Sequence, residues 1–322
     1  MKLKQENFLF VDLLSSIFLI ALLLGNMFGM LYITDGNIAI SLIASLLIVV
    51  FYYFILQMLK QNKEYIVNKK YMAPQSLFFL VFVLFGIVSF ILINHFLTVE
   101  TSYKERIRQD AYKKIESVQN IITEYGRRAD DDLQTLEGKS TTLLTQLKSN
   151  NSAALKNTLS QDPYKIDERV LAAPGYINVQ DVVNSSLEPV RKRMDADKKS
   201  FQKVFVPDLK NFKSDFDSWN RLTIMQNYED LKQYYSKAGK FLNQKIGELP
   251  YSKTPVELID KKEITQINDP MEMLKESKNF WLPLLFVLIT HLFILIPYFT
   301  YKVRKYKNNT GSTGPISGGI EI

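Results

Sequence analysis

The chain contains 322 residues, of which 47% are hydrophobic, and it has no cysteine, which excludes disulfides and thiol chemistry. Its formal net charge is +7 at pH 7, but the segment 98–279 holds 30 Lys and Arg against 28 Asp and Glu, a net charge of +2. The other ten basic residues lie beside apolar segments, where they serve to orient membrane helices. A nucleic-acid-binding protein concentrates its basic residues on one face, so we expect no nucleic-acid partner.

Four apolar runs account for much of the hydrophobic content. Each has about 20 or more residues, enough to cross a hydrocarbon layer ~30 Å thick as a helix, and none contains Lys or Arg. The first run is too long for the apolar core of a signal peptide and lacks a small-residue cleavage site, so we expect a retained helix. The sequence therefore predicts four transmembrane helices, in the segments 1–34, 35–59, 76–97 and 280–301.

The distribution of basic residues predicts the orientation of these helices. The segment 60–75 carries four lysines and one glutamate, and residues 302–307 carry four cations, whereas the link between the first two runs, Thr34–Asn37, has no base. Positively charged loops stay in the cytoplasm. We therefore expect both termini and a basic loop at 60–75 on the cytoplasmic side of a bacterial inner membrane. The tail 302–322 is basic and then rich in Gly, Ser and Thr, which predicts disorder.

The segment 98–279 is expected to form an extracytoplasmic (periplasmic) domain. Apolar residues recur every three or four positions from Thr98 to Leu147, which predicts one long helix with a coiled-coil-like seam. After a break around Pro163 and Pro174, helical spacing resumes, and Pro207 occupies a position typical of the first turn of another helix. Gly247 predicts the end of the last helix, and 250–270 reads as a linker. The predicted fold class is all-α: four transmembrane helices and an extracytoplasmic helical bundle of three to five helices.

The extracytoplasmic segment offers little for catalysis. It contains no His and no Cys, and the whole chain lacks recognisable nucleotide-binding or nucleophile motifs. The run Asp130–Asp132 lacks the spacing of a calcium loop, so we interpret it as a solvated charge cluster. An aromatic stripe could be a partner surface, although its helical spacing favours a bundle core; it comprises Phe212, Phe216, Trp219, Tyr228, Tyr234 and Tyr235. We expect no catalytic residue, no cofactor, no metal site and no enzymatic activity.

Polar residues within the apolar runs are candidate functional residues, because ionisable groups are costly inside a membrane. Asp12 lies only a few residues into the first run, where it can reach the interface as an anchor. Asn26 lies deeper in the same run, and His95 lies near the end of the third, where it can reach the interface too. His291 lies near the middle of the fourth run, and its spacing fits either a neutral, packed imidazole or a proton relay.

The first run also carries small residues at four-residue spacing, Ala21, Gly25 and Gly29. Such a stripe permits close approach of a second helix. At 100° per residue it lies on a different face from Asp12 and Asn26. We therefore expect this helix to pack on two sides, either at the centre of a helix bundle or in an oligomer contact.

The arrangement from "FVDLLSSIFLIALLL" to "KNFWLPLLFVLITHLFILIPYF" resembles the TssN family of inner-membrane components of type VI secretion systems. The resemblance implies a non-enzymatic structural or anchoring subunit of a multiprotein envelope complex. Its partners would be the lipid bilayer and other membrane or periplasmic proteins, in a homo- or hetero-oligomer. Two alternatives stay open: a membrane sensor with a helical input domain that signals through a partner, and a proton or ion conductor that uses Asp12 and His291.

Overall fold

The computed structural model describes residues 10–69, 73–258, 267–277, 280–302, 304–305 and 320–321. The chain divides into two compact units. Unit 1 comprises Met1–Ile107, Asn220–Gln226 and Ile264–Ile322, and unit 2 comprises Arg108–Trp219 and Asn227–Glu263. The segment expected to form one domain, 98–279, is therefore shared between the units: both of its ends and a short internal piece belong to unit 1.

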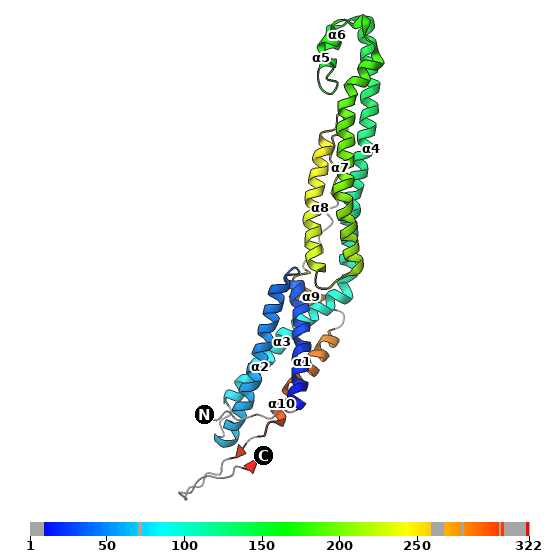
Figure 1. Ribbon diagram of the computed structural model, residues 1–322. Helices are drawn as coiled ribbons and strands as arrows, with labels where there is room; N and C mark the ends of the chain where they lie inside the picture. The colour runs from blue at the N-terminus through cyan, green and yellow to red at the C-terminus, as the bar shows by residue number, and fades with distance from the viewer. Residues whose placement is uncertain are drawn as a thin grey trace. The chain divides into compact units, whose positions relative to one another are not determined.

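Unit 1 contains the apolar helices. These are α1 (Phe10–Ile33), α2 (Ile38–Lys69), α3 (Ala73–Thr98) and α10 (Trp281–Thr300), with the short α9 (Pro270–Glu276) packed against α3. All four are long and apolar enough to cross a membrane, as the sequence predicts, and they indicate a multi-pass membrane protein. Helix α1 contacts α2, α3 and α10 (Figure 1), so it lies at the centre of this group of helices.

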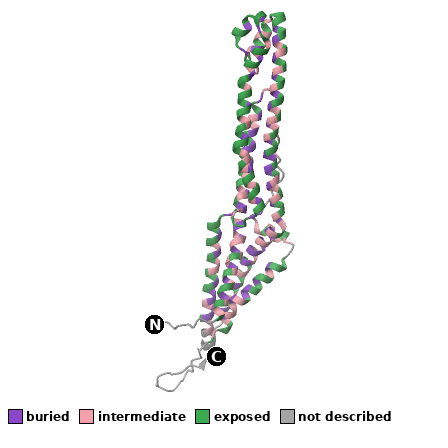
Figure 2. Cartoon of the chain, turned by 45° about the vertical axis from the view of Figure 1, so that its right-hand side comes forward, coloured by how far each residue is buried: buried purple, intermediate pink, exposed green. Residues whose placement is uncertain are grey.

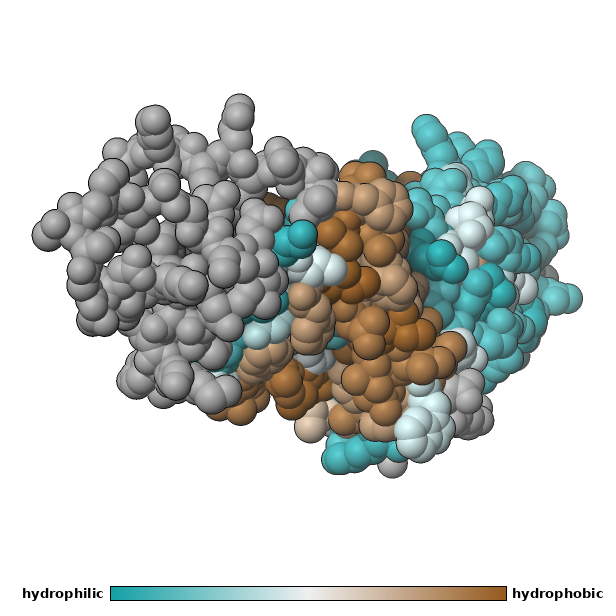
Figure 3. Space-filling view, turned by 90° about the horizontal axis from the view of Figure 1, so that it is seen from below, coloured by the Kyte–Doolittle hydropathy of each residue, from teal (hydrophilic) through white to brown (hydrophobic). Residues whose placement is uncertain are grey.

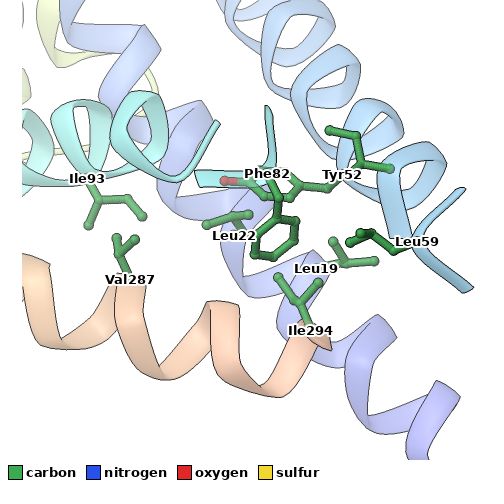
Figure 4. Packing of buried hydrophobic residues seen from close by; sticks show 9 residues of the cluster. Leu19, Leu22, Tyr52, Leu59, Phe82, Ile93, Val287 and Ile294 are labelled. Carbon is green, nitrogen blue, oxygen red and sulfur yellow. The ribbon is translucent and has the colours of Figure 1, made fainter. Parts of the chain in front are cut away.

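The core of unit 1 is formed where the four helices meet (Figure 4). Each apolar helix contributes two or three buried side chains to one cluster, which comprises Leu19, Leu22, Tyr52, Ile55, Leu59, Phe82, Ile93, Val287 and Ile294. The outward faces of the same helices expose many large apolar side chains, and these form a broad hydrophobic surface (Figure 3). A helix that is apolar all round suits lipid contact on one side and protein contact on the other.

The basic segment 60–75 is not a loop over most of its length. Helix α2 continues to Lys69, and α3 begins at Ala73. Lys, Gln and Glu are good helix formers, and neither Gly nor Pro interrupts the sequence before Pro74. Pro74 falls in the first turn of α3, where its missing N–H costs no hydrogen bond.

Unit 2 is also helical. The five-residue π-helix η1 (Val99–Tyr103) still belongs to unit 1, and α4, which enters unit 2 at Arg108, runs from Lys104 to Asn150 without interruption at its two glycines. It is followed by α5 (Ala153–Ser160), α6 (Glu168–Ala172), the 3-10 helix η2 (Pro174–Tyr176), α7 (Val179–Ser218) and α8 (Ile224–Gly247). Helices α4, α7 and α8 run side by side (Figure 1), with buried residues along the faces they turn to one another (Figure 2). Ring contacts such as Tyr125–Phe201 and Phe212–Tyr234 join them.

Two boundaries in unit 2 are informative. The expected helix start at Pro207 is wrong, because α7 continues through both Pro189 and Pro207. An internal proline removes one backbone hydrogen bond, but a continuous buried stripe that includes Phe201, Leu209 and Phe216 holds the helix on its partners across this point. The predicted helix end at Gly247 is confirmed.

The connecting segments differ in part from expectation. The linker 250–270 gives way at Pro270 to α9, whose first turn is capped by the Asp269 side chain. The disordered-tail prediction falls mostly on residues outside those described. Within the tail, however, β1 (Arg304–Lys305) pairs antiparallel with β2 (Ile320–Glu321), so these four residues are not unstructured. Such a short antiparallel pair needs only local backbone hydrogen bonds.

Candidate functional site

A chain of hydrogen bonds joins one polar side chain from each apolar helix of unit 1. Asn26 Nδ2 lies 3.1 Å from Ser89 Oγ, Ser89 Oγ lies 3.4 Å from Tyr52 Oη, and Tyr52 Oη lies 2.6 Å from His291 Nε2. All four residues are buried. We call Asn26, Ser89, Tyr52 and His291 the four-helix polar network, since they belong to α1, α3, α2 and α10.

The donors and acceptors of this network can be assigned. His291 Nδ1 lies 2.6 Å from the carbonyl oxygen of Val287, which can only accept, so Nδ1 carries a proton. In a neutral imidazole Nε2 is then an acceptor, and Tyr52 must donate to it. Ser89 consequently donates to Tyr52 and accepts from Asn26. Every hydrogen bond of the network is therefore donated in the same direction, from α1 towards α10. If His291 were protonated at Nε2 as well, it would have to donate to Tyr52, and the cation would be an unpaired charge in an apolar interior.

Helix α3 reaches His291 closely because it presents a glycine there. A Cβ atom on Gly86 would lie 3.1 Å from His291 Nε2. Two buried polar atoms have no hydrogen-bond partner among the described residues: Asn26 Oδ1 within the network, and the hydroxyl of Thr290, which precedes His291 in the sequence. The series of hydrogen bonds runs from the Asn26 amide to the Val287 carbonyl, and both of these groups lie inside unit 1.

Asp12 is not part of this network. Its carboxylate lies 3.0 Å from Lys60 Nζ, an ion pair between the first turn of α1 and α2. Lys63, one turn further along α2, donates to the carbonyl oxygens of Tyr298, Phe299 and Tyr301 at 2.8–3.2 Å. A lysine that satisfies the last carbonyls of a helix stabilises its end. The basic segment after the second apolar run thus ties α2 to the N-terminal end of α1 and the C-terminal end of α10.

His95 lies elsewhere, near the C-terminal end of α3. The sequence suggested that it could reach the interface, but the side chain is fully buried beside Tyr32, with ring centroids 6.3 Å apart. Neither ring nitrogen has a hydrogen-bond partner among the described residues. The reason for its burial is the close approach of α1. Tyr32 in turn donates a 2.5 Å hydrogen bond to Glu100, which pairs with Arg221 at 3.3 Å.

The two glycines of α1, Gly25 and Gly29, face α3. A Cβ atom on Gly29 would lie 2.3 Å from the carbonyl oxygen of Leu92, whereas one on Gly25 would meet only side-chain atoms of Ile93, at 3.0 and 3.2 Å. Ala21, one turn earlier, is half-buried. Asn26 reaches α3 too, so the polar and small faces of α1 both contribute to one helix pair within this chain.

The acidic run in α4 is not simply solvated. Asp130 pairs with Lys198 and Asp131 with Arg127, but Asp132 is buried. The Asp132 carboxylate accepts from the backbone N–H of Tyr251 at 2.8 Å, and from the N–H and hydroxyl of Ser252 at 3.1 and 2.6 Å. Asp132 therefore fixes the extended segment after α8 onto α4.

The aromatic stripe is mainly core, as its spacing favours: Phe216, Trp219, Tyr228 and Tyr235 are buried, and the other two are half-buried. Within the described residues, no group of three or more His, Cys, Asp or Glu side chains could hold a metal ion.

Tyr52, Ser89 and Gly86 were not foreseen from the sequence. Tyrosine and serine are common in membrane helices, and tyrosine usually marks the interface. The signal was the position of Tyr52, about 15 residues into its helix, where an interfacial role is implausible. Comparisons with protein-family models, with curated proteins and with solved structures find no match.

Proposed function

We propose that this protein is a non-enzymatic structural subunit that anchors a multiprotein complex of the bacterial envelope, of the type VI secretion kind that the family resemblance implies. The observation that carries the proposal is the four-helix polar network, which links one residue of every apolar helix. Interhelical hydrogen bonds of this kind hold membrane helices together. A rigid membrane anchor is what a structural subunit requires.

The placement of charges supports the same function. Lys60 and Lys63 hold helix ends on the side that the positive-inside rule assigns to the cytoplasm. Unit 2 would then lie in the periplasm, where its balanced charge and exposed polar helices suit contacts with other proteins. On this proposal the protein works as an oligomer or with partner subunits, in the inner membrane, with both termini in the cytoplasm.

Labelling tests the orientation directly, because the native chain has no cysteine. Single Gln61→Cys and Tyr176→Cys variants would be treated with a membrane-impermeant maleimide in cells with a permeabilised outer membrane. We expect labelling of Tyr176→Cys alone, with Gln61→Cys reacting only after lysis. The reverse pattern would overturn the proposed topology.

Purification tests the function. The tagged, full-length protein would be isolated in mild detergent from its native host, and its co-purifying proteins identified. We expect inner-membrane and periplasmic components of one secretion machine. Recovery of the protein alone, at native abundance and after mild crosslinking, would count against a structural subunit.

A sensor is the second candidate, and one observation favours it. The helix run Pro74–Asn150 continues from α3 through η1 into α4, and π-helical turns often mark functional positions. A continuous helix can transmit a change at one end to the other. Co-purification of a kinase or a response regulator in place of secretion components would decide for this reading.

A further inference from the structure

Tyr176 is exposed to an unusual degree. The residue is 95% exposed, more than any other large hydrophobic residue that the structure describes. It lies in η2, which comes between α6 and α7 in the chain. Helix α7 begins at the end of unit 2 where α4 ends (Figure 1). Most aromatic residues of unit 2 are instead packed between helices. Tyrosine is enriched at recognition surfaces, because its ring packs against a partner while its hydroxyl can form a hydrogen bond.

The turn that carries Tyr176 is held firmly on both sides. Pro174 and Ile177 are buried, and Ile177 belongs to a hydrophobic cluster with Leu147 and Val183. The Tyr176 N–H donates to Ala173 at 3.1 Å, and the Ile177 N–H donates to Pro174 at 3.2 Å. The ring is therefore presented on a fixed backbone, which lowers the entropy lost when a ligand binds.

Tyr176 is one of the residues that line a shallow, open hollow of about 590 Å³. Its lining combines Thr141, Thr145 and Lys148 of α4 with residues 175–180 of the turn and the start of α7, and it includes no acidic side chain. Both threonine hydroxyls donate to carbonyls of their own helix, which leaves their oxygen lone pairs as acceptors.

The amides of the hollow add further acceptors. Asn178 donates through Nδ2 to Asp181 at 2.6 Å, and Gln180 donates through Nε2 to Asn184 at 3.3 Å. The side-chain oxygen of each amide is thus available to accept. Lys148 Nζ donates to the carbonyl of Ile177 at 3.2 Å and retains two further protons. The hollow therefore offers several acceptors, one cationic donor and an aromatic platform.

We propose that Tyr176 and this hollow bind a saccharide chain. The C–H face of a pyranose is apolar and stacks on an aromatic ring, while its hydroxyl groups donate to acceptors such as those of the hollow. A protein partner would need roughly 1,000 Å² of interface with an apolar centre, and the lining around Tyr176 is polar. The inference rests on the proposed function, because that function exposes unit 2 to the glycans of the periplasm.

Binding would be measured by saturation-transfer NMR and calorimetry on the full-length protein in nanodiscs, with a tetrasaccharide of β-1,4-linked N-acetylglucosamine as the probe. We expect a dissociation constant on the order of 1 mM or below. Tyr176→Ala should weaken binding by about tenfold, whereas Tyr176→Phe, which keeps the ring, should stay within about threefold. Val204→Ala is the matched control, since Val204 is 52% exposed in unit 2 and is not part of the lining.

Two results would overturn the proposal: no binding by the unmodified protein at about 10 mM tetrasaccharide, well above the expected constant, or equal binding by Tyr176→Ala. A photo-crosslinking residue at position 176 that captures a polypeptide in cells would assign the surface to a protein partner. The purification described above separates the two proposals. If the unmodified protein co-purifies with its complex but does not bind the tetrasaccharide, the saccharide site alone is wrong.

Discussion

The contact between α1 and α3 makes a quantitative prediction at Gly29. In a Gly29→Ala variant the new methyl carbon would lie 2.3 Å from the Leu92 carbonyl oxygen and 2.7 Å from its carbonyl carbon. The ordinary limit for such a carbon–oxygen contact is about 3.3 Å, so the two backbones must separate by about 1 Å. Overpacking of this kind costs about 1–3 kcal/mol in the free energy of unfolding.

Gly25→Ala is the matched control. Both substitutions gain the same helix propensity, about 1 kcal/mol, but the methyl group at position 25 meets only Ile93 side-chain atoms, at 3.0 and 3.2 Å, which can move. We therefore expect Gly29→Ala to be less stable than Gly25→Ala by about 1–3 kcal/mol. This corresponds to a difference in melting temperature of about 2–10 °C.

The assay is thermal unfolding of both purified variants in one detergent, followed by circular dichroism. Size-exclusion chromatography before heating would show whether each variant is folded and of one size. If Gly29→Ala melts at or above the temperature of Gly25→Ala, the close approach of α1 to Leu92 is incorrect.

Three further predictions concern single side chains. His291→Ala should lower the free energy of unfolding by about 1–3 kcal/mol because it strands the buried Tyr52 hydroxyl; a Tyr52→Phe/His291→Leu double variant should recover much of that loss, and unfolding of the three proteins checks this. Asp132→Asn should weaken the anchoring of the segment after α8 by about 1–3 kcal/mol, seen as faster proteolysis there. Burial and the nearby Asp208 raise the pKa of Tyr234 in the folded protein. The protonated Tyr234 hydroxyl therefore contributes its full stabilisation below the unfolded pKa of about 10, and this stabilisation is lost as the pH rises towards the folded pKa. Tyr234→Phe should therefore reduce the alkaline loss of stability, measured by unfolding between pH 8 and about 11.

The sequence predicts the apolar helices well, because the residues of each helix alone are enough to identify it. Length and the absence of charge place α1, α3 and α10 to within a few residues. Helix α2 is the exception. The end of an apolar run shows where burial in the membrane ends, but the helix itself can continue beyond that point. The residues from Lys60 to Lys69 keep helical propensity after hydropathy ends. Pro207 misled for the related reason that packing along α7 overrides a local preference.

The candidate site could be predicted only in part. His291 and Asn26 stand out as polar residues in apolar runs, but their partners depend on packing between distant segments. Tyr52 and His291 are 239 positions apart, and no local periodicity connects them. Asp132 shows the same limit in unit 2. Its two acidic neighbours pair with basic side chains, and only the position of the segment after α8 distinguishes it from them.

The direction of the four-helix polar network bears on the choice between anchoring and conduction. A proton wire must reach both sides of the membrane through groups that can each take up and release a proton. This network starts at the amide of Asn26, which does not titrate, and ends at the backbone carbonyl of Val287. Asp12, the carboxylate that a wire would recruit, is paired with Lys60 instead. The same four side chains are explained by helix packing alone, because three of the hydrogen bonds join two helices and the fourth satisfies the His291 Nδ1 proton within α10. Proteoliposomes containing the Tyr52→Phe variant should therefore show the same proton flux as those with the unmodified protein, and a flux abolished by this one hydroxyl would restore conduction as the function.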